Sequence, residues 1–381
     1  MSQATLEHDH SVESRPALYV ALELSKSTWK LAMSDGRRRT PRIANVPARD
    51  LVRLEVELRA ARQRFGLPTE ARVLTCYEAG RDGFWIHRAL EKRGVTSLVV
   101  DAASIEVTRR RRRAKTDRID AQKLVAQLIR HWRGERVWSV VRVPEEDDED
   151  FRQPHRELEQ LKREVRKHRV RLQSLLFAQG IDVQIGARFA EEVASYRRWD
   201  GTTLPERLQR RLLREWQRLR LAHEQSREVE KERDGLLDGT DKSPRLTKVR
   251  MLAQMRGVGA SSAWLLVMEF FGWRGFANRR EVGAAAGFAP TPFQSGASHR
   301  EQGISKAGNP RVRSLMVELA WCWLRYQPDC KHVRWFRERF STEGSRRRRV
   351  GIVALARRLL VDFWRYLEHG VVPDGALLKT A

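Results

Sequence analysis

The chain has 381 residues and a mass of 44.4 kDa, which is enough for two or three domains with substantial cores. Apolar residues make up 41% of it, with 12 Trp and 13 Phe, and this excludes a wholly disordered basic protein. Lys and Arg outnumber Asp and Glu by 74 to 49, so the formal net charge is +25. Such an excess predicts a polyanionic partner, because basic surface neutralises phosphates and releases their counterions. We expect nucleic acid, with an anionic membrane surface as the alternative.

The sequence has none of the patterns of a membrane or secreted protein. No apolar run approaches the roughly 18 residues of a spanning helix. Residues 1–16 lack the basic and apolar regions of a signal peptide, and they predict a disordered tail. Cys76, Cys322 and Cys330 are too few and too scattered for a disulfide framework or a zinc site. We therefore expect a soluble protein in the cytoplasm, associated with the nucleoid and not with a membrane.

Residues 17–143 alternate between β and α patterns and predict one domain. Strands are expected at 18–24, 29–34, 42–46, 72–79 and 96–102, and helices at 48–65, 82–93 and 117–133. A hairpin of two or three strands, followed by strand–helix–strand–helix, fits an RNase H-like α/β layer fold.

An acidic run, PEEDDED (144–150), interrupts this pattern. It predicts a solvated linker, with a metal-binding cluster as the less favoured alternative. Apolar positions then recur at heptad spacing, with one polar member, at Leu158, Leu161, Val165, His168, Leu172 and Leu175. A second helical stripe runs over 208–229. An antiparallel helical pair and a dimerising coiled coil both fit, so residues 144–243 are expected to hold an acidic linker and coiled-coil helices.

Residues 244–370 predict a mainly helical domain, followed by a tail at 371–381. Residues 251–270 read as a helix, a GVG turn and a second helix. Residues 281–310 are rich in Gly, Pro, Ser and Ala, which predicts a loop, and further helices are expected at 311–326 and 350–367. The fold class is therefore α/β plus α.

Four acids in the first domain are the main candidates for chemistry. Glu23 lies inside an apolar strand, where an unpaired carboxylate is costly, and Glu78 ends another buried strand. Asp117 and Asp120 are three residues apart and share one helix face. In an RNase H-like fold these elements converge on one edge, where four carboxylates suit two Mg²⁺ ions for in-line attack on phosphodiesters. Each acid also has a plain structural reading, as a strand-edge residue, an N-cap or an ion-pair partner, but the joint pattern favours the metal site.

A serine in the C-terminal loop is the second candidate. Ser295 stands between Gln294 and Gly296, and cations follow it. A serine that attacks phosphorus needs a deprotonating group and cations to stabilise the developing charge. On pattern alone a serine in a Gly-rich loop is usually a turn residue, and the rival serines are Ser298, Ser305, Ser261 and Ser262. The residues expected to contact nucleic acid are Arg109, Arg110, Arg111, Arg112, Arg113, Lys115, Arg300, Lys306, Arg311 and Arg313.

The sequence resembles a known family over nearly its whole length. The segments LYVALELSKSTWKLA (18–32), CYEAGRDGFWIHRALEKRGV (76–95) and RRAKTDRIDAQKLVAQL (112–128) are similar to the N-terminal domain of the insertion-sequence-110 transposases and their insertion-sequence-1111 relatives. The segment from MRGVGASSAWLL to RVRSLMVELAW (255–321) is similar to the C-terminal domain of the same transposases.

The resemblance implies a Holliday-junction-resolvase-like first domain and a C-terminal transposase domain. Members are recombinases guided by a structured bridge RNA. It further implies that Glu23, Glu78, Asp117 and Asp120 bind Mg²⁺ and that Ser295 attacks DNA to form a phosphoserine link. The implied partners are double-stranded DNA of the element ends and target, a structured guide RNA and further copies of the chain, as a dimer or tetramer. One subunit's serine would then complete another subunit's acidic site.

The chain departs from the family at the first acid. The family has Asp there, in a pattern like GIDVSK, whereas this chain has Glu23 in ALELSK. Glu keeps the charge but moves the carboxylate by one methylene. The expected function is a DNA transposase or recombinase that cuts and rejoins DNA. The alternatives are a metal-dependent junction nuclease that uses the four acids only, and a non-catalytic nucleic-acid-binding descendant, which Glu23 favours.

Overall fold

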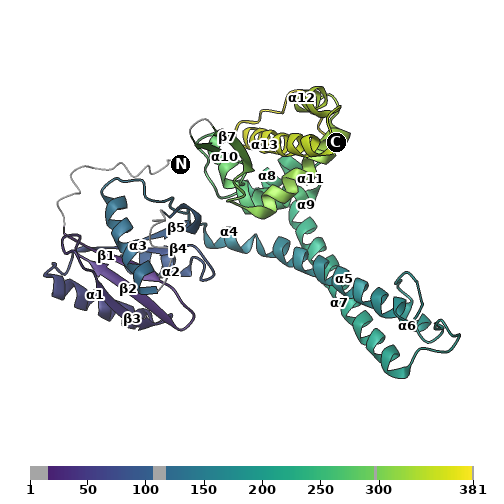
Figure 1. Cartoon of the computed structure of the whole chain (residues 1–381), viewed down its shortest axis with the longest axis horizontal. Coiled ribbons are helices and arrows are strands. Elements are labelled where there is room, and N and C mark those ends of the chain that lie inside the picture. Colours follow the sequence, from purple (N-terminus) through teal and green to yellow (C-terminus); the bar gives the residue numbers. More distant parts are fainter. Residues whose placement is uncertain (1–15, 106–116, 296–297, 380–381) are drawn as a thin grey trace. The chain divides into compact units, whose positions relative to one another are not determined.

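The chain divides between Val143 and Pro144 into two units, each with its own core. The computed structural model describes residues 16–105, 117–295 and 298–379 (Figure 1). It combines a five-stranded sheet with many helices, so the predicted α/β plus α class is confirmed at this level.

The first unit is built on the five-stranded sheet, in the order β3-β2-β1-β4-β5. The strands are β1 (Ala17–Glu23), β2 (Thr28–Ser34), β3 (Arg42–Pro47), β4 (Arg72–Glu78) and β5 (Thr96–Val100). β2 pairs antiparallel with β1 and β3, whereas β1, β4 and β5 run parallel. Every strand expected from the sequence is present, within a few residues of its predicted bounds.

Helices cover both faces of this sheet. They are α1 (Leu51–Phe65), α2 (Trp85–Glu91) and α3 (Asp117–Trp132), with a short 3₁₀ turn η2 (Ala102–Ser104). α1 and α2 bury apolar side chains against one face, where they pack with Leu18, Val20 and Leu22 of β1. α3 packs on the opposite face against Ala21 and Cys76. Since side chains alternate along a strand, the two faces draw on alternate residues of β1.

The second unit is mostly helical. Its elements are α4 (Glu146–Asp150), α5 (Gln153–Phe177), α6 (Phe189–Glu192), α7 (Glu206–Asp238), α8 (Pro244–Ala253), α9 (Ala260–Leu266), a π-helical turn η4 (Val267–Phe271), α10 (Arg279–Ala285), β6 (Pro290–Ser295), β7 (Ser298–Ile304), α11 (Pro310–Tyr326), α12 (Lys331–Phe340) and α13 (Ser345–His369). Its core holds fully buried aromatic side chains, among them Trp264, Trp323 and Phe363. None of the helices in the described part of the chain is long and apolar enough to cross a membrane.

The expectation of a solvated acidic linker at 144–150 was wrong in part. Residues 146–150 form helix α4. Glu145 and Asp148 cap its N-terminus, because the side chain of each accepts a hydrogen bond from the backbone N–H of the other. Asp148 is buried, and Arg245 donates a 2.5 Å hydrogen bond to its Oδ1. The acidic run is therefore a capped helix that is fastened to α8.

The heptad seam is explained by an antiparallel pair, α5 with α7, within one chain (Figure 1). His168, the polar residue of the heptad pattern, pairs with Glu215 on α7: its Nδ1 lies 2.7 Å from Oε1 of Glu215. Arg171 and Arg218 also donate to the same buried carboxylate. Of the two alternatives, the chain itself forms the helical pair, and dimerisation stays a prediction.

Candidate functional site

Two of the four candidate acids end neighbouring parallel strands. The register of β1 and β4 pairs Leu22 with Tyr77, and Glu23 and Glu78 are the next residues along. By the two-residue period of a strand, both lie on the face that Cys76 shares and α3 covers. Glu23 is half-buried and Glu78 is exposed. The two acids therefore hold adjacent positions on one face, at the carboxyl-terminal edge of the sheet.

The direction of α3 brings the other two acids to the same edge. The guanidinium of Arg72, which begins β4, lies 5.4 Å from the ring centroid of Trp132, which ends α3. α3 thus runs antiparallel to β4, and its first turn, with Asp117 and Asp120, lies toward the carboxyl-terminal edge. Acidic side chains in the first turn of a helix interact favourably with its dipole. Asp120 also forms an ion pair within the helix, in which its Oδ1 lies 3.6 Å from Lys123 Nζ. The four positions thus share one edge and one face of the sheet.

The side chains at this edge do not form a ready metal site. Among the described residues, no group of three or more His, Cys, Asp or Glu side chains is arranged to hold a metal ion. Carboxylates that lie close together repel one another, and a bound cation offsets this repulsion. The donors themselves are hard oxygens, which Mg²⁺ prefers. The positions and the chemistry of the four acids therefore fit a divalent cation.

Cys76 lies two residues before Glu78, on the same face of the sheet. Burial raises the pKa of Cys76, and the nearby Glu78 carboxylate raises it further, so this thiol stays protonated at neutral pH and packs in the core. Six of the basic residues expected to bind nucleic acid lie outside the described residues: Arg109, Arg110, Arg111, Arg112, Arg113 and Lys115.

The segment around Ser295, expected to be a loop, is a β-hairpin. β6 and β7 pair antiparallel, and Ser295 and Ser298 form the last pair before the tip. Residues 296–297 and the side chains of 293–302, which include that of Arg300, lie outside the described residues. The backbone thus presents Ser295 at the end of a two-stranded ribbon.

The base of the hairpin is a tightly packed junction. Gly308 has a φ of +122°, and a Cβ built on it would lie 2.4 Å from the carbonyl oxygen of Ala285. Gly287 has a φ of +76°, and a Cβ there would meet a guanidinium nitrogen of Arg313 at 2.5 Å. Only glycine fits both positions, because each combines a left-handed backbone with contact against a neighbour. The ribbon that carries Ser295 therefore rises from a closely fitted support.

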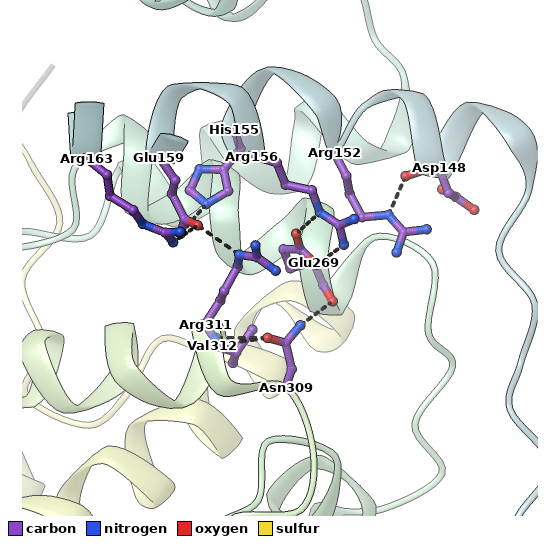
Figure 2. A network of polar contacts seen from close by, with 10 residues as sticks. All are labelled: Asp148, Arg152, His155, Arg156, Glu159, Arg163, Glu269, Asn309, Arg311 and Val312. Atoms are coloured by element: carbon purple, nitrogen blue, oxygen red, sulfur yellow. Dashed lines mark hydrogen bonds and ion pairs between the residues drawn. The ribbon is translucent and has the colours of Figure 1, made fainter. Parts of the chain in front are cut away.

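A polar network connects this support to the helical pair (Figure 2). Asn309 caps α11 by accepting from the backbone N–H groups of Arg311 and Val312. Arg156 of α5 donates two hydrogen bonds, of 2.7 and 3.1 Å, to the carboxylate of Glu269 in η4. Arg311 donates a 2.9 Å hydrogen bond to Glu159 of α5. α5, η4 and α11 are thus joined by charge-assisted bonds.

Glu269 is the centre of this network, and the sequence did not draw attention to it. Its side chain is only 3% exposed. Burial by itself would raise its pKa, but the hydrogen bonds and charge of Arg156, with the charges of Arg311 and Arg152, outweigh burial and hold the pKa below its ordinary value. The signal available was a lone carboxylate in the apolar run LLVMEFF, which requires a cation from elsewhere in the fold.

Two of the predicted phosphate-binding cations also have internal partners. Arg311 pairs with Glu159, as described above. Arg313 donates to the main-chain carbonyls of Ala286 and Lys306, across the base of the hairpin. Lys306 is exposed, in a left-handed conformation with φ +56°. Arg311 and Arg313 therefore stabilise the base of the hairpin through contacts within the chain.

Comparisons with known proteins show that this chain is similar to transposases. Residues 249–335 match the family model of the IS116/IS110/IS902 transposases, a segment that includes Glu269 and the Ser295 hairpin. A putative transposase of Sinorhizobium fredii, y4rJ, is 41% identical over 386 residues, covering 96% of this chain and 95% of that protein. The transposase for insertion sequence element IS1533 of Leptospira borgpetersenii is 26% identical over 65% of this chain and 69% of its own length. The transposase for element IS1328 of Yersinia enterocolitica is 26% identical over 60% of this chain and 65% of its own length.

Proposed function

The chain belongs to the IS116/IS110/IS902 family of transposases, enzymes that act on DNA, and from this we propose that it cuts DNA at the ends of an insertion element and at its target and rejoins the strands. The proposal is supported by two features that occur in the same chain. Four carboxylates share one edge of the sheet, and a serine stands at the end of a firmly supported ribbon in the family-matched segment.

The first domain supports an RNase H-like assignment. Its sheet has three consecutive antiparallel strands, β1 to β3, followed by β4 and β5, which run parallel to β1. Helix α3 runs antiparallel to β4. In such a fold the carboxyl ends of the first and fourth strands and the start of the late helix meet. Glu23, Glu78, Asp117 and Asp120 are the residues that would hold Mg²⁺ there. When bound, the ion supplies charge stabilisation at the phosphoryl oxygens.

Ser295 is the proposed nucleophile. Its Oγ attacks the phosphorus of the scissile phosphodiester, and a phosphoserine link forms as the P–O bond to the leaving strand breaks. The proton that Oγ loses passes through solvent to the oxygen of the leaving strand. The link keeps the phosphate activated, so the hydroxyl of an incoming strand displaces the serine and restores a phosphodiester. Lys306, exposed at the base of the hairpin, is suited to attract the DNA backbone.

The partners follow from the charge and the family. A net charge of +25 suits two nucleic acids at once, DNA and a structured guide RNA, and we propose both as partners. We also propose that the protein acts as a dimer or tetramer, because cutting an element end and a target requires more than one strand to be held.

The test is a recombination assay on plasmids that carry the element with its flanking non-coding DNA. Ser295→Ala should still bind DNA but should lose the covalent protein–DNA adduct and the recombined junction by at least about a hundredfold, since loss of a nucleophile removes the step it performs. Ser298→Ala is the matched control, because Ser298 faces Ser295 across the hairpin register, and it should keep both products.

Each other outcome has a definite meaning. An adduct formed by Ser295→Ala would refute the nucleophile assignment. Cleavage without any adduct, equal in the unchanged protein and in Ser295→Ala, would identify a nuclease that uses the four acids only. No cleavage by any form of the protein, with DNA still bound, would identify a non-catalytic descendant.

A further inference from the structure

A groove of about 810 Å³ lies in the second unit, between α10, α12, α13 and the base of the β6–β7 hairpin. It takes in none of the four acids, and it does not include Ser295. Six arginines line it: Arg279, Arg280, Arg349, Arg357, Arg358 and Arg365. Only Arg349 belongs to a basic run that stands out in the sequence, the four arginines of 346–349. The other five come together through the packing of two helices, α10 and α13.

The charge in the groove is strongly unbalanced. Asp362 is the one acid among the residues that line the groove. His332 Nε2 lies 2.6 Å from one oxygen of the Asp362 carboxylate, and Arg365 lies 3.6 Å from the other. In the described part of the chain, no carboxylate lies within 4 Å of the remaining five arginines. Burial and the charge of Arg339 lower the pKa of Arg358, against the smaller opposing effect of Asp362. A ligand that brings negative charge would relieve this repulsion.

The lining also offers flat and apolar surface. The Arg358 guanidinium is stacked 3.9 Å from the ring centroid of Trp335. Along one face of α13, Val350, Ala354 and Val361 stand at helical spacing among the arginines, and Val350 is 61% exposed. Nucleic-acid bases stack on such aromatic and guanidinium planes, while their phosphates pair with arginine.

We propose that this groove binds an unpaired segment of DNA, with phosphates on the arginines and a base against the Trp335–Arg358 stack. The partner rests on the proposed function, because rejoining requires a cut strand to leave its duplex. The size of the groove is that of sites which enclose a small ligand, such as one or two nucleotides, and a duplex would keep its base faces from the stack.

The test uses the full chain and a fluorescent oligothymidine of about 12 nucleotides, within the usual range of single-strand sites. Arg357→Gln/Arg358→Gln should bind it at least about tenfold more weakly, and the slope of log affinity against log salt should fall by about 1.4, which is 0.7 for each lost phosphate contact. The matched control is Arg166→Gln/Arg169→Gln, which removes two exposed arginines from α5 and should weaken binding less than about threefold.

A second variant separates stacking from charge and from folding. Trp335→Ala should weaken binding at least about fivefold, the lower value for loss of one stacked base, without changing the salt slope. Circular dichroism and thermal unfolding check that each variant is folded, and Arg358→Lys, which keeps the charge and loses the plane, should bind between the unchanged protein and the double variant.

Three results would overturn the inference. One is equal binding by the groove variant and the α5 control. Another is an equal loss for a DNA duplex, which would indicate a general electrostatic surface. The last is tighter binding of oligouridine than of oligothymidine, which would exclude DNA as the occupant.

This assay and the recombination assay fail independently. Oligonucleotide binding requires neither Ser295 nor the four acids, so Ser295→Ala should bind oligothymidine normally. An adduct in Ser295→Ala would refute the nucleophile and leave the groove standing. Normal binding by the groove variants, with the adduct lost in Ser295→Ala, would refute the groove alone.

Discussion

Glu23 and Glu269 show how the same side chain takes different roles according to its surroundings. Both interrupt apolar runs. Glu269 is buried, and its charge is matched by two hydrogen bonds from Arg156, so it belongs to the framework. Glu23 ends its strand half-buried, next to Glu78 at the carboxyl-terminal edge of the sheet. A carboxylate beside other acids is a better candidate for metal binding than one enclosed by arginine.

Replacing Glu23 tests the first acid of the proposed metal site. Glu23→Asp restores the residue type of the family and should keep Mg²⁺-dependent cleavage at or above the level of the unchanged protein. Glu23→Gln removes the charge and should lower cleavage at least about a hundredfold, because loss of even an outer partner of a metal site costs about 10–100-fold. The measurement is the rate of cleavage as a function of Mg²⁺ concentration.

Glu70→Gln is the matched control for this prediction. Glu70 is an exposed acid just before β4, so it lies at the opposite end of the strand from Glu78, and its replacement should leave the rate unchanged. Cleavage by Glu23→Gln equal to that of the unchanged protein would contradict a role for the Glu23 carboxylate.

At the scale of elements, the network of Figure 2 decides how the ribbon is supported. α5, η4 and α11 come from three distant parts of the chain, and Arg156 and Glu269 are 113 residues apart. A π-helical turn places Glu269 among apolar neighbours, and π-helical turns are often found at functional sites. The support of the hairpin therefore depends on an ion pair between the helical pair and the C-terminal core.

The network predicts a specific loss of stability in acid. The pKa of Glu269 is lowered in the folded state, so its contribution is present above the ordinary value of 4.5 and is lost as the pH falls below that value toward the lowered one. Glu269→Gln should unfold more easily at pH 7, by about 1.5–3 kcal/mol for a hydrogen bond to a charged group. The difference between the two proteins should shrink at pH 3 to 4. Urea unfolding followed by tryptophan fluorescence measures it.

Glu318→Gln, an exposed acid on α11, is the control for this measurement and should follow the unchanged protein at both pH values. Other acids with lowered pKa values, such as Glu159 and Glu215, titrate in all three proteins and cancel in the comparison. A stability difference that stays constant from pH 7 to pH 3 would show that Glu269 acts by packing and not by charge.

At the scale of the whole molecule, the proposed chemistry is divided between two units. The four acids belong to residues 1–143 and Ser295 to residues 144–381. Each unit has its own core, so replacing an acid in the first unit or Ser295 in the second removes no side chain from the core of the other unit. This division makes complementation between two inactive variants a direct test of how copies of the chain cooperate.

A mixture of Ser295→Ala with Glu78→Ala should regain recombination that neither variant has alone. If dimers form at random in a 1:1 mixture, half are mixed, and one of the two shared sites in each is intact, so about a quarter of the activity should return. Recombined junctions are counted by quantitative PCR. Mixing Ser295→Ala with the double variant Ser295→Ala/Glu78→Ala is the control and should restore nothing. No recovery in the first mixture would contradict a site shared between subunits.

Much of the local structure could be predicted from the sequence alone. The strands of the sheet were found because apolar residues in β1 and β4 form short buried runs, and the helices because their apolar residues recur at three and four positions. The resemblance to the transposase family was also readable without a structure, and the comparisons bear it out. The candidate acids and Ser295 were identified from the sequence as well, and their catalytic roles stay predictions.

Other features depended on contacts that no local pattern contains. The direction of α3, which carries Asp117 and Asp120 to the edge of Glu23 and Glu78, follows from its packing on the sheet. The hairpin of β6 and β7 forms because a Pro-containing segment pairs with a Gly-containing one, although neither has a clear strand pattern. The burial of Glu269, and the meeting of the α10 and α13 arginines in one groove, likewise join residues far apart in the chain. Periodicity is a short-range property, whereas pairing, burial and charge balance depend on residues that only folding brings together.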